Sequence, residues 1–257
     1  MNPVMDVLLK RKSVREYEQR DISAEVRAEI LTATLRAPTA GNLMLYSIID
    51  ITDQALKDKL AVSCDNQPFI ATAPMVWMFV ADYQRWFDYF LACGVEELCA
   101  QKNMTMRKPA EGDLFLACCD TLIAAQNAVV AAESFGIGSC YIGDILEQYE
   151  FHKELFHLPQ YALPVGLLVF GYPTQAEKER QLTARFKRDF IVFENQYRQL
   201  EPSEFDEMFA GRSRYLQNNP VAGIANPGQA IYMRKFSAAF SVEMNRSVQA
   251  MLKEWMK

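Results

Sequence analysis

The segment that most restricts the fold is a near-continuous apolar run, Met75–Ala81, which directly follows Pro74. Successive side chains of an extended strand point to opposite faces, so a strand that is apolar at every position must be covered on both faces. Residues 137–142 and 163–171 are similarly apolar, and residues 46–51 also read as a strand. A sheet made of such strands needs helices on both sides.

Helical patterns separate these strands. Residues 3–11 and 23–36 read as helices, and the second begins at the capping residue Ser23 and ends before Pro38. Shorter helices are expected near 53–61 and over 146–156. The alternation argues for an α+β or α/β sheet layered with helices.

The longest helical pattern runs from Asp113 to Phe135 and is closed by Gly136, a residue suited to a helix C-terminus. Its strongly polar positions recur every seven residues and form one stripe, at Asp113, Asp120, Asn127 and Ser134. The remaining positions are mostly Leu, Ala, Cys, Val and Ile. We therefore expect this helix to be buried nearly all round, in a core or at a subunit interface.

The C-terminal part is less regular. Residues 190–193 (Phe-Ile-Val-Phe) form an isolated strand candidate beyond a charged loop. From about residue 200 the chain contains a loop rich in Asn, Pro and Gly (218–229) and an amphipathic helix that ends at Trp255. Because no linker shows a shift in composition, we predict a single domain, with residues 201–257 as an extension of it.

Composition excludes several function classes. The 257 residues carry a net charge of −5, whereas a general nucleic-acid partner would need a basic surface. Every long apolar stretch contains polar breaks and the N-terminus lacks a signal-peptide pattern, so we expect no membrane span. The six cysteines show no Cys-x-x-Cys spacing, which favours reduced thiols and a cytoplasmic location.

The two histidines, His152 and His157, are not spaced to lie on one helical face as ligands. Zinc and a Ser-His-Asp hydrolase are both poorly supported, and we expect no metal site. Both histidines are interpreted as ordinary surface or packing residues.

Positive charge is concentrated near the N-terminus, where residues 11–15 read Arg-Lys-Ser-Val-Arg. These side chains supply donors suited to phosphate oxygens. In a second interpretation, Asn2 caps a helix with Pro3 in its first turn, and Lys10–Lys12 offset the dipole at its C-terminus. The segment alone leaves both interpretations open.

Two further segments suggest a ligand. Residues 37–42 (Ala-Pro-Thr-Ala-Gly-Asn) form an irregular turn that exposes backbone donors. Residues 136–144 (Gly-Ile-Gly-Ser-Cys-Tyr-Ile-Gly-Asp) match neither the dinucleotide fingerprint nor a P-loop. Gly138 and Gly143 bracket a buried strand, where either a flat ligand approaches the backbone or neighbouring elements pack closely.

These segments, together with residues 66–68 (Asn-Gln-Pro) and 163–173, occur in the order and spacing of one family. The chain resembles the FMN-dependent nitroreductases and flavin reductases, and in particular their NADPH-preferring, oxygen-insensitive group. The resemblance covers roughly residues 1–200, which would form the FMN-binding domain. It implies an α+β, three-layer fold with a central, mostly antiparallel sheet covered by helices. It also implies an intertwined homodimer with FMN in clefts between the subunits.

Carried over position by position, the resemblance assigns the cofactor contacts. The residues that would contact the phosphate, ribityl chain or ring of FMN are Arg11, Lys12, Ser13, Arg15, Thr39, Ala40, Gly41, Asn42, Gln67, Tyr141, Ile142, Gly143 and Arg185. Flavin N5 would carry the chemistry, supported by the Gly143 amide and by Arg15, so no catalytic side chain is expected. NADPH or NADH would supply hydride, and nitroaromatics, quinones or flavins would accept it in ping-pong fashion.

Some features depart from the family or stay open. Met44 stands where an amide is usual, and Thr183 where a lysine is usual. Arg212, Arg214 and Arg234 either meet the NADPH 2′-phosphate or are simply solvated. The aromatic set Trp86, Phe87, Tyr89 and Phe90 either roofs the acceptor pocket or, as we favour, packs in the core or an interface. Alternative functions are a dehalogenase of the same family and a flavin-binding sensor or store without turnover.

Overall fold

A computed structural model describes residues 2–257. It contains two compact units, Met1–Arg180 with Glu243–Lys257, and Gln181–Val242, and each is described by itself. The units divide at residue 180, whereas the expected limit of the FMN-binding domain is residue 200.

The first unit is built on a four-stranded antiparallel sheet in the order β1-β2-β4-β3. Its strands are β1 (Tyr46–Asp50), β2 (Met75–Asp82), β3 (Gly138–Ile142) and β4 (Ala162–Gly171). Every residue of β2 is buried. Val76 and Met78 belong to the hydrophobic cluster on one face of the sheet, and Trp77 and Phe79 to the cluster on the other. The expected antiparallel sheet, covered on both faces, is confirmed.

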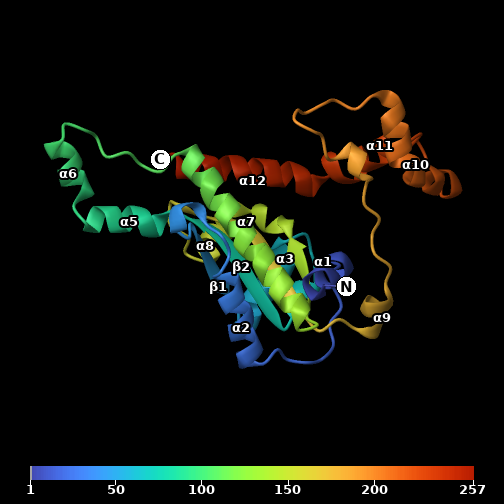
Figure 1. Ribbon diagram of the computed structural model, residues 1–257, viewed down its shortest axis with the longest axis horizontal. Helices are drawn as coiled ribbons and strands as arrows, with labels where there is room; N and C mark the ends of the chain where they lie inside the picture. Colours follow the sequence, from blue (N-terminus) through green and yellow to red (C-terminus); the bar gives the residue numbers. More distant parts are fainter. Residues whose placement is uncertain (1) are drawn as a thin grey trace. The chain divides into compact units, whose positions relative to one another are not determined.

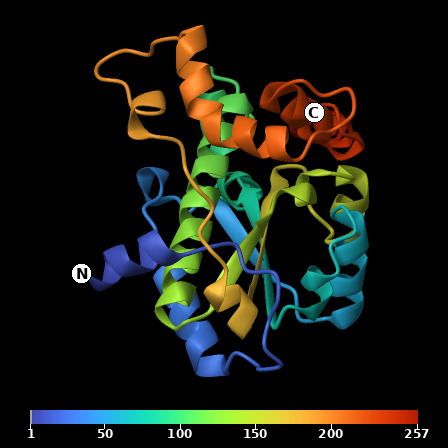
Figure 2. The ribbon, with the colours of Figure 1, turned by 90° about the vertical axis from the view of Figure 1, so that its right-hand side faces the viewer.

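Helices form the two outer layers, which Figure 2 shows with the green α7 on one side of the sheet and the blue-green α3 on the other. One layer contains α2 (Ala24–Thr34) and α7 (Glu111–Ser134), whose residues share a cluster with Trp77 and Phe79. The other contains α3 (Gln54–Ser63), α4 (Phe69–Thr72) and the turn η2 (Gly143–Leu146). The α+β, three-layer class is therefore confirmed.

Within the single chain α7 is buried on one side only, so its burial nearly all round, in a core or at a subunit interface, stays a prediction. Its small residues, such as Ala124, Ala125 and Ala128, are fully buried against the sheet. The other side exposes large apolar residues, among which Phe115 is 72% exposed. By length and composition α7 could cross a membrane, but the core helix of a soluble protein passes the same test.

Several helices complete the first unit. The predicted α1 (Pro3–Lys10) is confirmed, and Asn2 caps it by accepting a hydrogen bond of 2.9 Å from the Val4 amide. Also present are α5 (Gln84–Ala92), α6 (Val95–Gln101), α8 (Tyr149–Leu155), α9 (Gln175–Glu179) and, from Glu243 onward, α12 (Ala239–Trp255), which Figure 1 labels. Trp255, near the end of α12, is fully buried and packs edge-on against Tyr161.

The second unit contains η3 (Arg188–Phe190), α10 (Pro202–Asn218), α11 (Pro227–Ile231) and the π-helical turn η4 (Tyr232–Phe236). The expected strand at residues 190–193 is wrong, because η3 ends at Phe190 and the following residues are irregular. Ile191 and Val192 are more than half exposed. Apolar residues favour a strand only where a neighbouring strand and a packed face receive them.

Candidate cofactor site

The basic segment 11–15 leaves α1 in an extended conformation and lies along β3. The Val14 amide donates to the Ser139 carbonyl at 2.9 Å, and Ser13 forms a bridge with Ser139. Val14 is buried, and a Cβ atom placed at Gly138 would lie 2.4 Å from its Cγ2 atom. At Gly138, close packing therefore explains the glycine.

Helix α9 holds the same segment from the other side. Glu177 accepts a hydrogen bond from the Arg15 amide at 3.1 Å and pairs with the Arg180 side chain at 2.8 Å. The Lys12 ammonium donates to the Lys178 carbonyl at 2.9 Å and to that of Arg180. Two of the three Lys12 protons are thus used in joining α9 to the N-terminal segment. Glu177 and Arg180 are not predictable from the sequence, because the only local signal beside them is the capping residue Thr174.

Arg11 is a half-buried cation with an unused donor. Within residues 2–257 its buried Nε atom has no hydrogen-bond partner. Glu133 of α7 interacts with Arg11 electrostatically, but burial raises the pKa of Glu133 to about 7. A neutral Glu133 would leave the guanidinium charge uncompensated. A buried, unpaired donor on a cation is suited to an anionic ligand, and the contact of Arg11 with a cofactor phosphate stays a prediction. The helix-dipole interpretation applies instead to Lys10, which pairs with Asp6 at 2.8 Å.

The turn 39–45 is organised by Asp120 of α7. Its carboxylate accepts hydrogen bonds from the Ala40 amide at 2.9 Å, the Leu45 amide at 3.2 Å and the Thr39 hydroxyl. Gly41 and Asn42 adopt positive φ values of 56° and 58° and are exposed. The side chain of Met44, where the family usually has an amide, packs against the buried cluster of α2 and α7.

Gln67 lies close to the segment 141–144, to which it is joined by a hydrogen bond. The Gln67 amide nitrogen donates to Asp144 Oδ2 at 2.7 Å, and Asp144 directly follows Gly143. Gly143 is exposed, and nothing in the described chain lies within 4 Å of a Cβ atom placed on it. Ile142 is 1% exposed and belongs to the buried cluster on this face of the sheet, so its contact with a cofactor stays a prediction. Burial raises the pKa of Tyr141 to about 12, which keeps its hydroxyl neutral.

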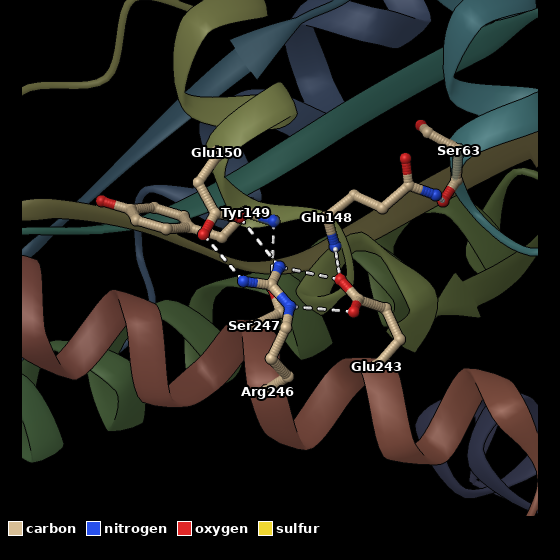
Figure 3. A network of polar contacts seen from close by, with 7 residues as sticks. All are labelled: Ser63, Gln148, Tyr149, Glu150, Glu243, Arg246 and Ser247. Carbon is tan, nitrogen blue, oxygen red and sulfur yellow. Dashed lines mark hydrogen bonds and ion pairs between the residues drawn. The ribbon is translucent and has the colours of Figure 1, made fainter.

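The segment after Gly143 is anchored by a polar network between α3, α8 and α12 (Figure 3). Arg246 makes two hydrogen bonds of 2.8 Å to Glu150 and two of 2.9 Å to Glu243. Glu243 also accepts the Gln148 amide at 3.1 Å, and the Gln148 side chain donates to the Ser63 carbonyl. None of these residues belongs to a motif that is recognisable in the sequence.

The aromatic residues of α5 mostly pack. Trp86 donates its indole N–H to the Leu43 carbonyl at 2.7 Å, and the Phe87 ring lies 5.1 Å from that of Tyr161. Trp86 and Phe87 border the cluster that includes Leu45. Tyr89 is 56% exposed. This arrangement favours the packing interpretation for Trp86 and Phe87.

The second unit contains the remaining predicted cations. Arg185 donates to the Thr183 carbonyl at 3.3 Å, and its contact with a cofactor phosphate stays a prediction. Arg212 and Arg234 line a cavity of about 730 Å³ together with Tyr215 and Met233. Arg214 is not among the residues that line this cavity in the described chain.

Similar known proteins identify the family and the fold of this chain. A sequence model of the nitroreductase family matches residues 8–172. The oxygen-insensitive NADPH nitroreductase of Salmonella typhimurium is 30% identical over 213 residues, which is 82% of this chain and 82% of that protein. The FMN reductase (NADPH) of Bacillus subtilis is 28% identical over 199 residues, 77% and 75% of the two chains. The crystal structure of nitroreductase A from Vibrio parahaemolyticus shares the fold, with a TM-score of 0.79, 24% identity and coverage of 98% and 97%.

Proposed function

This chain belongs to the nitroreductase family, and from that premise we infer that it is an FMN-dependent oxidoreductase that takes hydride from NADPH or NADH. The names of the relatives support both FMN and NADPH, since one is an NADPH nitroreductase and another an FMN reductase that uses NADPH. NADPH is the better candidate for the co-substrate, because both names specify it.

The observation that carries this proposal is the fit of the first unit to a flat, phosphate-bearing ligand. Arg11 has a buried, unpaired Nε atom, and Arg15 is an exposed cation in an otherwise acidic chain. The open space at Gly143 allows a ring to approach the backbone. Gln67 supplies a side-chain amide beside that space. The donors and the open surface suit FMN.

When bound, FMN supplies hydride acceptance and donation at its N5 atom. Arg11, with Lys12 and Ser13, would bind the phosphate and ribityl oxygens. The positive charge of Arg15 would stabilise negative charge near the pyrimidine edge and so favour the reduced form of the cofactor. The turn 39–42 and Gly143 would orient the ring. The protons that accompany hydride in the reduction of the acceptor would come from solvent, so no side chain has to act as a proton donor or acceptor.

The acceptors that we propose are nitroaromatics, quinones or free flavins, which would occupy the place vacated by the nicotinamide. One shared place for donor and acceptor implies ping-pong kinetics. We propose a cytoplasmic location for this enzyme, consistent with the six cysteines, all of which are free thiols in the structure.

We further propose a homodimer whose interface includes the exposed side of α7. The large apolar residues on that side are Phe115, Leu116, Leu122 and Ile123, each at least 40% exposed. A contiguous apolar face of this kind marks an association surface. A partner subunit on this face would bury the side of α7 that is exposed in the single chain, as the composition of the helix suggests.

The test is to purify the chain and follow its colour. We expect a yellow protein that bleaches under anaerobic NADPH and recovers when a quinone or nitroaromatic compound is added. A yellow protein that never bleaches would support a flavin store or sensor instead. Release of halide from a halogenated aromatic, without nitroreductase turnover, would support the dehalogenase alternative. A colourless protein that does not bind added FMN would contradict the proposal and both alternatives.

A further inference from the structure

Both protons on the Gln67 side-chain nitrogen are committed to the protein. Nε2 donates to Asp144 Oδ2 at 2.7 Å and to the Cys64 carbonyl at 2.8 Å. A carboxylate oxygen and a carbonyl oxygen are both acceptors, so only the nitrogen of the amide can face them. With the amide reversed, the Gln67 oxygen would lie against two other oxygens. The chemistry of its neighbours therefore determines the orientation of the Gln67 amide.

This orientation decides what Gln67 offers to a ligand. Its Oε1 atom accepts no hydrogen bond from any group in residues 2–257, and the side chain is only half-buried. Gln67 therefore presents an acceptor and has no spare donor. A ligand group that meets this oxygen must carry an N–H or O–H.

The pyrimidine end of a flavin carries acceptors at N1, O2 and O4, and one donor, the imide N3–H. We propose that Asp144 is a positioning residue, which holds the Gln67 amide so that its oxygen accepts a hydrogen bond from the N3–H of bound FMN. This inference rests on the proposed function, because it requires FMN at this site.

Glu147 is a second acidic residue that contacts Asp144. Its side chain is buried, one carboxyl oxygen is without a partner in the described chain, and the carboxyl group that forms a hydrogen bond with it is that of Asp144. Burial, Asp144, Asp65 and Glu243 together raise the pKa of Glu147 to about 7. At pH values below 7 Glu147 is therefore mostly protonated and can donate a hydrogen bond to Asp144, which still accepts one from Gln67.

The inference is tested with two ligands, FMN and 3-methyl-FMN, in which a methyl group replaces the N3 proton. Quenching of flavin fluorescence gives both dissociation constants for the apoprotein. We expect wild type to bind FMN about tenfold more tightly than 3-methyl-FMN. This is the change in affinity that follows from losing one hydrogen bond and leaving its acceptor unpaired. In Asp144→Asn the new amide can donate to the Gln67 oxygen, so a reversed Gln67 amide would face one opposing oxygen, that of Cys64, instead of two. The preference for FMN over 3-methyl-FMN should therefore be smaller than in wild type.

Two controls separate this role from general damage. Asp65→Asn removes the same charge from an exposed neighbour and should keep the preference of wild type. Gln67→Ala should lose the preference, and adding Asp144→Asn to it should change nothing further, since one residue acts through the other. Thermal melts show whether each variant folds; should Asp144→Asn not fold, Asp144→Ser is measured in its place.

The outcomes distinguish the two levels of inference. A preference in Asp144→Asn equal to that of wild type, with FMN still bound, overturns the role of Asp144 and leaves the proposed function intact. An additive effect of Asp144→Asn in the Gln67→Ala background also overturns it. Failure of the folded wild-type apoprotein to bind either flavin overturns the proposed function and this inference with it.

Discussion

The carboxylate of Asp120, midway along α7, accepts a hydrogen bond of 2.9 Å from the backbone amide of Ala40. Asp120 is 3% exposed and also holds the Thr39 hydroxyl and the Leu45 amide. The Thr39 hydroxyl oxygen in turn accepts the Met44 amide at 2.8 Å. One buried side chain thus organises the whole turn that is proposed to line the cofactor.

We predict that Asp120→Ala lowers the free energy of unfolding by about 3 kcal/mol, because it leaves several donors unpaired in a buried place. Chemical denaturation with urea measures this loss. FMN affinity should fall as well, because the turn is no longer fixed. Asp88→Ala, a change of the same type on exposed α5, is the control. A variant as stable as wild type would show that water replaces the carboxylate.

The strands and most helices of the first unit could be predicted because their signals are local. Apolar runs and the capping residues Asn2 and Ser23 lie within the elements that they define. Helices α5 and α6 were missed because they lack such signals: Tyr83 and Gly94, at their N-termini, make no side-chain capping bond. The strand expected at 190–193 was wrong because an apolar run carries no information about whether a partner strand exists.

The candidate site was predictable to the same extent. Its contiguous motifs can be read from the sequence and stay predictions, but the residues that hold them cannot, since Thr39 and Asp120 lie 81 positions apart and Arg15 and Glu177 lie 162 apart. Such pairs leave no local pattern in one sequence. The two glycines of the segment 136–144 could not be told apart either, because only the fold shows that Gly138 meets Val14 and that Gly143 faces open space.

That difference gives a matched pair of substitutions. Gly143→Ala should change the free energy of unfolding by no more than about 0.5 kcal/mol, since its new methyl group meets nothing. It should nevertheless weaken FMN binding at least about tenfold, because the methyl group fills the space proposed for the ring. Gly138→Ala should instead destabilise the fold by about 2 kcal/mol through its clash with Val14. Unchanged FMN affinity in Gly143→Ala would argue that the ring lies elsewhere.

The cavity of the second unit suggests a test of nucleotide preference. Arg212→Ala and Arg234→Ala remove the two arginines that line it. If they bind the 2′-phosphate, KM for NADPH should rise about tenfold in each variant, the size of one charge-assisted hydrogen bond, while KM for NADH stays the same. Arg214→Ala is the control. Equal effects on NADPH and NADH would exclude a role in 2′-phosphate recognition.

The exposed face of α7 predicts the behaviour of the chain in solution. Phe115→Glu places a charge among the apolar residues of that face, where burial in an interface would be costly. Light scattering coupled to size exclusion should show a dimer for wild type and a shift towards monomer for this variant. Phe151→Glu, which alters an exposed aromatic residue on α8, is the control. A monomeric wild type would contradict the proposed homodimer.

The raised pKa of Glu147 makes stability depend on pH in a defined direction. Its pKa is about 7 in the folded chain, chiefly through burial and Asp144, with Asp65 and Glu243 adding to it. The ordinary value of 4.5 applies when unfolded, so between these values the folded state binds one proton more. The contribution of Glu147 is therefore greatest below pH 4.5 and is lost as pH rises through 7.

The side chain of Glu147→Gln cannot ionise. We predict that this variant becomes more stable relative to wild type as pH rises. The difference in free energy of unfolding between variant and wild type should grow by on the order of 1–2 kcal/mol from pH 5 to pH 8. Urea denaturation of the apoprotein across this range measures it, and the comparison cancels the titration of Glu133, which both proteins share. Asp65→Asn should show a smaller change of the same sign, because it removes one of the charges that raise the pKa of Glu147. A difference that is constant with pH would mean that Glu147 is already ionised at pH 5, and that its buried carboxyl group is stabilised by a partner other than Asp144.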